Sequence, residues 1–210
     1  MDKIRKVQFI FLFIAAIIGA FLFLYLVPNK QPATIVASVN GEVITLEYLN
    51  NRHNLFGHGI DKYQFLNDEV IPAKILLQEA EKRGIKASKE EIENAFSEFV
   101  KSSKKEFMKN IKKTGMTERK IKQLIEEQVI VSKLVQEIIP KMSVADKEIK
   151  EFYDKNIAVF TKNGTIMPFG EVKERIKEMV LKANQEIKIR EYVTKLGQQG
   201  EVVMYDPDKL

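Results

Sequence analysis

Apolar residues are distributed unevenly along the chain, and the first concentration of them dominates its organisation. Residues 9–27, FIFLFIAAIIGAFLFLYLV, form a run of 19 positions without a charge or a proline. At the α-helical rise of about 1.5 Å per residue, this run spans roughly 28 Å, close to the hydrocarbon thickness of a bilayer. We therefore expect a transmembrane helix that ends at Pro28.

The residues that flank this run predict its orientation. Lys3, Arg5 and Lys6 precede it, and basic residues favour the cytoplasmic side of a membrane. We therefore expect a single-pass anchor in the inner (cytoplasmic) membrane, with the C-terminal domain in the periplasm or outside. A cleaved signal peptide is the alternative, but its apolar core is typically about 7–15 residues long and precedes a small-x-small cleavage site. Residues 26–30 read LVPNK, and no cysteine is present for a lipid anchor.

Two stretches with β-forming residues lie at opposite ends of the remaining chain. Residues 35–44, IVASVNGEVI, contain Asn40-Gly41 between β-branched residues, which is a strong signal for a two-residue hairpin turn. Residues 201–205, EVVMY, form the last such stretch. Because an isolated hairpin is marginally stable in water, we expect the final strand to pair with the hairpin and bring the ends of the domain together.

Between these strands, apolar positions recur at helical spacing. Thr45, Ser88, Thr117 and Ser143 are expected N-caps, and Gly84 is an expected C-terminal signal. The segment 50–67 is less regular, and 161–167 is expected to form a turn. The first predicted helix begins near Leu46. Further helices are predicted from residue 89 to a break at Ser102 and Ser103, and over residues 68–83, 104–113, 118–139, 144–155 and 168–196. The last helix carries one apolar stripe, formed by Phe169, Val172, Ile176, Met179, Val180, Ala183 and Ile187.

The amino-acid composition argues against disulfide bonding, thiol chemistry and nucleic-acid binding. The chain has no cysteine, so neither disulfides nor thiol chemistry are available. Its net charge is +5, but from residue 31 onward 30 basic side chains face 28 acidic ones. This nearly neutral, mixed pattern is typical of solvated helix faces and argues against a nucleic-acid-binding surface.

The candidates for catalytic or metal chemistry are few. His53 and His58 lie near Asp61, whereas a metal site requires three or four convergent ligands. The chain contains no Gly-x-Ser-x-Gly elbow and no glycine-rich nucleotide loop. We therefore expect no catalytic residue, no metal and no cofactor.

The segment after Ser102 combines basic and adaptable apolar residues. A solvated helix face is the ordinary interpretation of its lysines, and contact with anionic lipid or an acidic client is the alternative. Methionine suits promiscuous surfaces, although core packing explains the same pattern. The expected client-binding residues are Leu49, Phe56, Phe99, Phe107, Met108 and Met116.

The order of these elements resembles a known family of extracytoplasmic folding factors. The stretches VASVNGEVITLEYLNNR, IPAKILLQEAEKRGIKASKEEIENAF, KKTGMTERKIKQLIEEQVIVSKLV and SVADKEIKEFYDKN resemble the chaperone region of SurA-type and PrsA-type foldases. The anchor resembles that of PpiD, a membrane-tethered relative. The C-terminal MPFGEVKERIKEMVLKANQEIKIREYVTKL and VVMY resemble the returning helix and closing strand of this region.

The resemblance implies a mainly α fold: a transmembrane helix followed by a multi-helix SurA-like lobe with a small antiparallel sheet. We expect a cytoplasmic tip and anchor at 1–28, a linker at 29–34, and a chaperone domain at 35–210. Within that domain, 35–156 forms the first part, 157–167 replaces the parvulin prolyl-isomerase insert of catalytic relatives, and 168–205 returns to close the sheet.

The expected function follows from this resemblance. It implies an ATP-independent chaperone for unfolded exported or outer-membrane proteins, without prolyl isomerase activity and without nucleic-acid binding. An interaction or scaffold subunit of an envelope complex, docked on a partner protein, is one alternative. A divergent peptidyl-prolyl isomerase is another.

Overall fold

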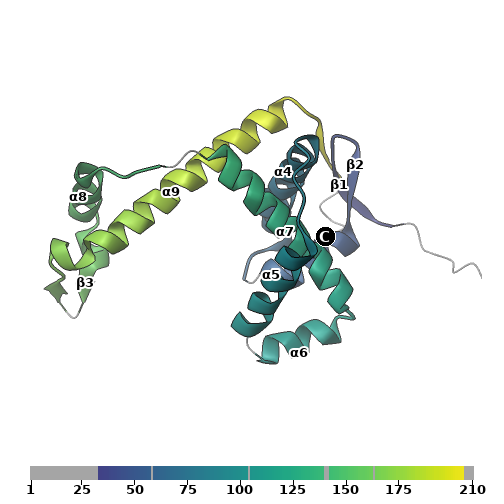
Figure 1. Cartoon of the computed structure of the whole chain (residues 1–210), viewed down its shortest axis with the longest axis horizontal. Helices are drawn as coiled ribbons and strands as arrows, with labels where there is room; N and C mark the ends of the chain where they lie inside the picture. Colours follow the sequence, from purple (N-terminus) through teal and green to yellow (C-terminus); the bar gives the residue numbers. More distant parts are fainter. Residues whose placement is uncertain (1–32, 58, 104, 140–141, 163, 206–210) are drawn as a thin grey trace, which may run out of the picture. The chain divides into compact units, whose positions relative to one another are not determined.

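The computed structural model describes residues 33–57, 59–103, 105–139, 142–162 and 164–205 (Figure 1). Residues from Ile35 onward form one compact unit. The expected anchor at residues 9–27 lies outside the described residues. Among the helices of the described ranges, none is both long and apolar enough to cross a membrane.

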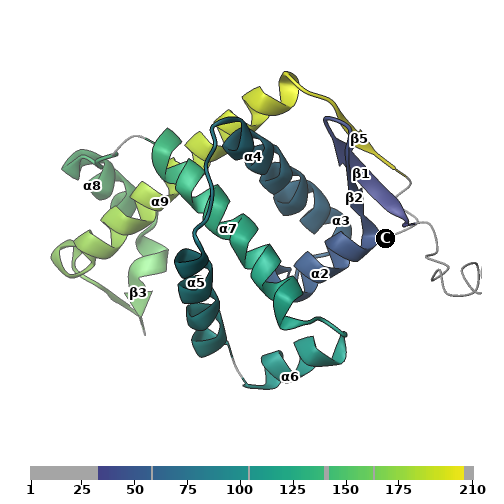
Figure 2. The same cartoon turned by 45° about the vertical axis from the view of Figure 1, so that its right-hand side comes forward.

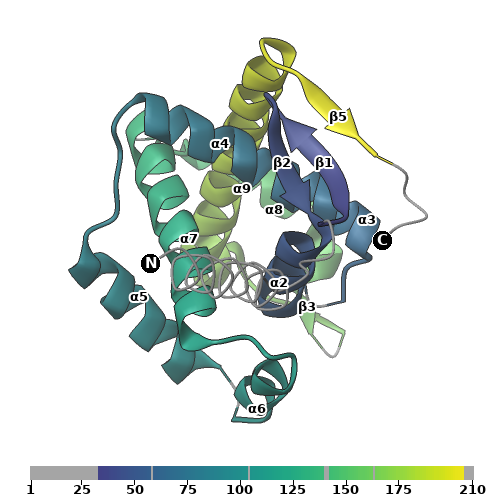
Figure 3. The same ribbon diagram turned by 90° about the vertical axis from the view of Figure 1, so that its right-hand side faces the viewer.

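A three-stranded antiparallel sheet joins the two ends of this unit. Strand β1 (Ile35–Val39) lies between β2 (Glu42–Thr45) and β5 (Val202–Met204), as Figure 3 shows. Asn40 and Gly41 have positive φ angles of 51° and 81°, as a type I′ turn requires. Asn40 also holds β5, because its side-chain oxygen accepts a hydrogen bond from the Glu201 amide at 2.8 Å. The predicted pairing of the first and last strands is therefore confirmed.

The helices that follow the hairpin depart from the predicted boundaries. Thr45 caps α2 (Leu46–Phe56), as expected, but the helix continues well into the segment predicted to be irregular. The next helix was predicted to start at residue 68, which is wrong. Its N-cap is Asp61, and α3 (Lys62–Phe65), a π-helical turn η1 (Leu66–Val70) and α4 (Ile71–Lys82) follow without interruption.

The π-helical turn explains how this helix accommodates Pro72. The Ile71 amide donates to the Leu66 carbonyl, five residues earlier, so the ladder is already shifted where proline lacks an N–H group. After α4, Gly84 takes a φ of 71° and the Ile85 amide donates to the Ala80 carbonyl at 2.9 Å. This is the hydrogen-bond pattern of a Schellman motif, and it confirms the predicted glycine stop.

The middle of the chain forms a helical hairpin with a short helix at its tip (Figure 2). Helix α5 (Lys89–Ser102) starts with the predicted capping box of Ser88 and Glu91, and ends at Ser103. Helix α6 (Lys105–Lys113) then leads to Thr117, which caps α7 (Glu118–Ile138). Arg83, at the end of α4, hydrogen-bonds to Glu137 on α7 at 2.7 Å and to Tyr192 on the last helix at 2.7 Å. These bonds tie three helices together.

The last part of the unit is a small lobe on a long helix. It contains α8 (Asp146–Lys155), a 3₁₀ turn η2 (Ile157–Phe160), strands β3 (Thr161–Lys162) and β4 (Thr165–Ile166), and the first half of α9 (Phe169–Gln198). Figure 1 shows α9 running from this lobe back to the sheet. The predicted cap at Ser143 is wrong, because the N-cap is Ala145, whose amide donates to the Glu148 carboxylate at 2.8 Å. The predicted turn at 161–167 contains the extra β3–β4 hairpin.

Two sets of buried residues stabilise opposite halves of α9. Val172 and Ile176 are buried against α8 and η2, together with Ile149 and Phe160. The second half of α9 packs against α4 and α7 around Leu76, Ala80 and Leu134. The single stripe predicted for this helix is therefore wrong at Met179 and Ile187, which are 38% and 54% exposed.

Candidate client-binding surface

Helix α5 places apolar side chains at the surface without burying any of them. Its apolar positions have helical spacing, yet none of its residues is buried. Ala95, Phe96 and Phe99 pack only partly against the cluster of Ile121, Leu124 and Ile125 on α7. The ring of Phe99 meets that of Phe56 on α2 edge-on, with their centroids 6.4 Å apart. This helix therefore offers half-exposed aromatic surface on a support that is itself well packed.

The six residues expected to bind clients fall into two groups. Leu49 is fully buried beneath the sheet, and Met116 is 5% exposed within the cluster between α5 and α7. Phe56, Phe99 and Met108 are half-buried. The side chain of Phe107 lies outside the described part of the structure. The structure thus brings Phe56 and Phe99 together and places Leu49 and Met116 in the core that supports them.

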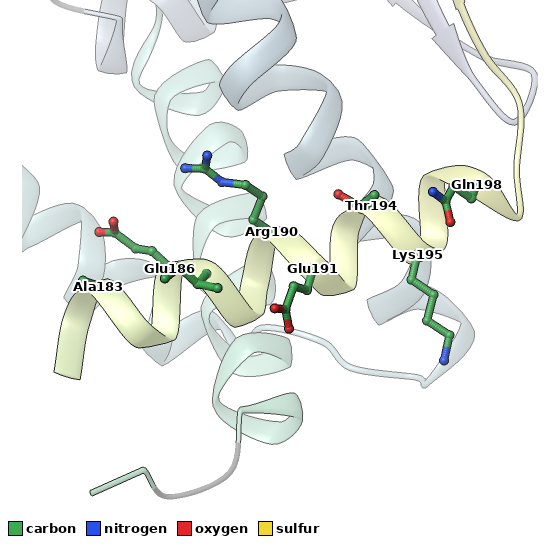
Figure 4. Close-up of a pocket in the computed structure, with 8 residues that line it drawn as sticks. Ala183, Glu186, Arg190, Glu191, Thr194, Lys195 and Gln198 are labelled. Atoms are coloured by element: carbon green, nitrogen blue, oxygen red, sulfur yellow. The ribbon is translucent and has the colours of Figure 1, made fainter. Parts of the chain in front are cut away.

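A second apolar surface lies along the middle of α9. A hollow of about 540 Å³ is lined by Ala183, Glu186, Ile187, Arg190, Glu191, Thr194, Lys195 and Gln198 (Figure 4). Figure 4 shows Glu186 and Arg190 directed to one side of the helix, and Glu191 and Lys195 to the other. Ile187, which is 54% exposed, lines the same hollow as these charged residues. A smaller hollow of about 260 Å³, between α9 and Ile138 and Ile139 at the end of α7, shares Glu191 and Lys195.

A third hollow, of about 500 Å³, lies between α2 and α7 and is lined by more polar than apolar residues. Its lining includes Tyr48 and Glu127, whose side chains are joined by a 2.6 Å hydrogen bond from the tyrosine hydroxyl. Arg52 donates to the same carboxylate at 2.7 Å and is 2% exposed. Burial raises the pKa of the Tyr48 hydroxyl well above its ordinary value, and the neighbouring Glu127 charge adds to this rise. Tyr48 and Arg52 on α2 thus join Glu127 on α7, while the buried Nε atom of Arg52 has no hydrogen-bond partner among the described residues.

The described residues show no cluster suited to holding a metal ion. No group of three potential metal-ligating side chains occurs among them. The Nε2 atom of His53 lies 2.8 Å from the Ile60 carbonyl oxygen, and its ring packs edge-on against Phe65. This histidine therefore closes the turn between α2 and α3. What the arrangement offers is apolar surface of two kinds, on α5 and on α9, each beside charged side chains.

Comparison with known proteins assigns this architecture. Residues 1–135 match the family model of the SurA-like N-terminal domain. The chain belongs to this family. The resemblance drawn from the order of the helices and caps is thereby confirmed.

Curated relatives of this SurA-like chain carry the name foldase protein PrsA. One from Clostridium botulinum strain Langeland is 20% identical over 200 residues, covering 82% of this chain and 60% of that protein. One from Clostridium perfringens is 29% identical over 172 residues, covering 68% of this chain and 50% of that protein. The SurA-like chain therefore spans only about half to three-fifths of the length of these relatives.

A solved structure supports the fold. It belongs to work on the virulence factor PEB4 and the periplasmic protein Cj1289, described as two structurally related SurA-like chaperones of Campylobacter jejuni. The match has a TM-score of 0.55 at 14% identity and covers 82% of this chain and 99% of that one. At this identity the likeness establishes the arrangement of the helices and the sheet.

Sequence reasoning missed the exposed middle of α9, although a signal for it was present. Helix α9 has 30 residues and α8 has ten. At about 1.5 Å per residue, the shorter helix covers only about a third of the longer one. Beyond α8, an apolar position of α9 is covered only where α4 or α7 packs against it, and Ile187 remains 54% exposed.

Proposed function

We propose that this SurA-like chain is an ATP-independent chaperone that holds unfolded exported proteins. The observation that carries the proposal is the half-exposed apolar surface on α5 and α9 in a chain of the SurA-like family. An unfolded client exposes aliphatic and aromatic side chains that are buried after folding. Surfaces such as Phe96–Phe99 and Ile187 offer these side chains a place to pack while the client remains unfolded.

The chemistry of the two surfaces suits weak and reversible binding. Neither surface is an enclosed cavity, so a bound side chain loses only part of its contact with water. Around Ile187, Glu186 and Arg190 on one side and Glu191 and Lys195 on the other supply both signs of charge. A mixed rim of this kind tolerates clients of different charge and favours none strongly. No nucleotide is needed, because release follows when the client buries its own apolar surface.

The proposed setting is the extracytoplasmic side of the cytoplasmic membrane. It is supported by the apolar run at residues 9–27 and the basic residues before it. The likeness to a SurA-like chaperone structure from work that includes a periplasmic protein agrees with this setting. We accordingly propose outer-membrane or other exported proteins as the clients, and the bilayer as the attachment of the chain.

We further propose that the described unit acts without prolyl isomerase chemistry. The family resemblance implies that catalytic relatives carry a separate domain between the helices that correspond to α8 and α9. In this chain the described residues of that interval form η2 and the two-residue strands β3 and β4. We infer that so short an interval is insufficient to build a separate isomerase domain. Isomerisation of a proline-containing peptide at the uncatalysed rate, in the presence of the fragment 33–210, is the expected result.

Aggregation of a non-native client tests the proposed function. An unfolded outer-membrane-type protein is diluted from denaturant with and without the fragment 33–210, and light scattering is recorded. We expect suppression that grows with the ratio of chaperone to client and needs no nucleotide. Unchanged scattering at a several-fold excess of the fragment would refute the proposal and favour the interaction-subunit alternative.

A further inference from the structure

The net charge of the chain is concentrated in one short segment. Residues 101–116 contain six lysines and one acidic residue, Glu106, and so carry a net charge of +5. The full chain of 210 residues also has a net charge of +5. From residue 31 onward the net charge is only +2, so this segment outweighs a net negative charge on the rest of the domain. The positive potential of the domain is therefore strongest at the end of α5 and on α6.

The structure fixes these lysines at the surface. Ile111 and Met116 are only 3% and 5% exposed and attach the inner side of the segment to the core between α5 and α7. With the inner side held in this way, the charged side chains remain in solvent. We define the lysine surface as five exposed residues: Lys101, Lys105, Lys109, Lys112 and Lys113.

The lysine surface differs from the neighbouring helix α7 in its ion pairing with the described residues. Within the described residues, none of its five side chains forms an ion pair. The adjacent helix α7 behaves differently, because Lys120 pairs with Glu47 at 2.5 Å and Lys133 pairs with Glu91 at 2.8 Å. Acidic residues near α7 thus neutralise its lysines, whereas the lysine surface keeps its charge for an external partner.

We propose that the lysine surface binds the anionic headgroups of a lipid bilayer. Ammonium groups are compact point charges, without the planar fork by which arginine fits one carboxylate or phosphate. The segment 101–116 contains no arginine. An array of this kind matches the diffuse negative field of a membrane better than a single shaped acidic partner. Each lysine close to an anionic membrane contributes a factor of about five in affinity.

The short segment before β1 keeps the folded unit close to the proposed lipid bilayer. Seven residues, 28–34, separate the apolar run from the first strand. Fully extended, they span at most about 25 Å. If the apolar run occupies the bilayer, the folded unit is tethered beside the same lipid surface at high effective concentration. A modest attraction is then sufficient to orient the unit, with the end of α5 and α6 facing the headgroups.

A proximity measurement on the full chain tests this inference. Because the chain contains no cysteine, Ser102→Cys provides a unique labelling site beside the lysine surface, and Thr165→Cys provides a comparison site on β4. Each labelled chain is placed in nanodiscs of phosphatidylcholine, with or without phosphatidylglycerol at about a third of the lipid. Quenching of the label by headgroup-attached quenchers reports its distance from the membrane.

We expect quenching at residue 102 to rise at least about threefold in the anionic discs, and quenching at residue 165 to change little. High salt should abolish the rise, because the screening length shortens from about 8 Å to about 3 Å at 1 M. The variant Lys105, Lys109, Lys112 and Lys113→Gln should also abolish it. A matched variant changes four exposed lysines elsewhere that form no ion pair with the described residues, namely Lys86, Lys89, Lys155 and Lys182→Gln, and should keep the rise.

Two results would overturn the inference. One is equal quenching in neutral and anionic discs, which would leave an acidic protein as the remaining class of partner. The other is an equal loss in both glutamine variants, which would mean that net charge and not the lysine surface is responsible. Neither result bears on the aggregation assay, so failure of this inference is distinguishable from failure of the proposed function.

Discussion

Arg52 on α2 donates a hydrogen bond to Glu127 on α7 at 2.7 Å, across 75 residues of sequence. The arginine side chain is 3% exposed and the glutamate side chain 25%. Tyr48 donates to the same carboxylate oxygen at 2.6 Å. The contact joins the helix that follows the sheet to the helix that supports α5, so it determines where the half-exposed aromatic surface stands.

Removing the carboxylate should be costly for this reason. In Glu127→Ala the Arg52 guanidinium stays buried without its counter-charge, and the free energy of unfolding should fall by about 3 kcal/mol. The neighbouring Glu126 forms no hydrogen bond or ion pair with the described residues, so Glu126→Ala should change it by less than about 0.5 kcal/mol. Urea denaturation of both variants makes the comparison. Equal losses would show that the ion pair has no special part in the fold.

The hairpin turn gives a second test, through backbone conformation. Gly41 has a φ of 81°, a backbone conformation that is strained for residues with a side chain. Gly170 lies at the start of α9, and no atom lies within 4 Å of an added Cβ there. Gly41→Ala should lower stability by about 1–2 kcal/mol. Gly170→Ala should raise it by about 0.5–1 kcal/mol, because glycine is a poor helix former. Thermal unfolding that moves in the same direction for both variants would contradict this account of the turn.

Acid should weaken the start of α5. Hydrogen bonds from Lys133 and from the Ser88 backbone lower the pKa of Glu91 from 4.5 to about 2. The stabilisation from this carboxylate is therefore complete above pH 4.5 and is lost as the pH falls toward 2. In Glu91→Gln that pH-dependent contribution is missing.

The stability difference between wild type and Glu91→Gln should accordingly shrink as the pH falls through this range, and chemical denaturation at a series of pH values measures it. Glu90→Gln is the control, because Glu90 is exposed and forms no hydrogen bond with the described residues. Parallel curves for wild type and Glu91→Gln down to pH 2 would rule out the proposed role of the capping box and Lys133.

The α9 surface can be tested without disturbing the fold. Met179 and Ile187 are 38% and 54% exposed, so changing both to Gln should alter stability by less than about 0.5 kcal/mol. Suppression of client aggregation should nevertheless weaken at least about threefold, because each lost apolar contact contributes roughly 1 kcal/mol. Val43 and Val159 are 48% and 58% exposed outside this surface, and changing both to Gln should leave suppression intact. The reverse order of effects would exclude α9 as a client surface.

The parts of the fold that could be predicted from sequence are those set by neighbouring residues. Asn40-Gly41, Thr45 and Ser88 act within three or four positions, so their turn and caps are visible in the sequence. The incorrect prediction of an N-cap at Ser143 also came from reading a local pattern of neighbouring residues. A serine resembles the usual cap, but the observed bond runs from the Ala145 amide to Glu148, and a side-chain oxygen at the N-cap is not required for it.

The parts that escaped prediction depend on tertiary packing. The Arg52–Glu127 pair links distant segments, and no local pattern marks it. The π-helical turn before Pro72 interrupts the periodicity that would have placed the helix start at Asp61. The two apolar surfaces, on α5 and α9, could not be predicted for the same reason. Leu49 is buried and Ile187 is exposed because of which helices pack against them. In the sequence both are simply apolar residues at helical spacing, so the pattern does not distinguish the buried position from the exposed one.

Crosslinking from position 187 tests the central claim most directly. A photoreactive residue replaces Ile187 in the full chain, intact membranes are irradiated, and the attached proteins are identified. A matched chain carries the same residue at Val159. If the chain is a chaperone, position 187 should capture many different exported proteins in non-native form, and far more of them than position 159. A single folded partner in constant ratio to the chain would contradict the account.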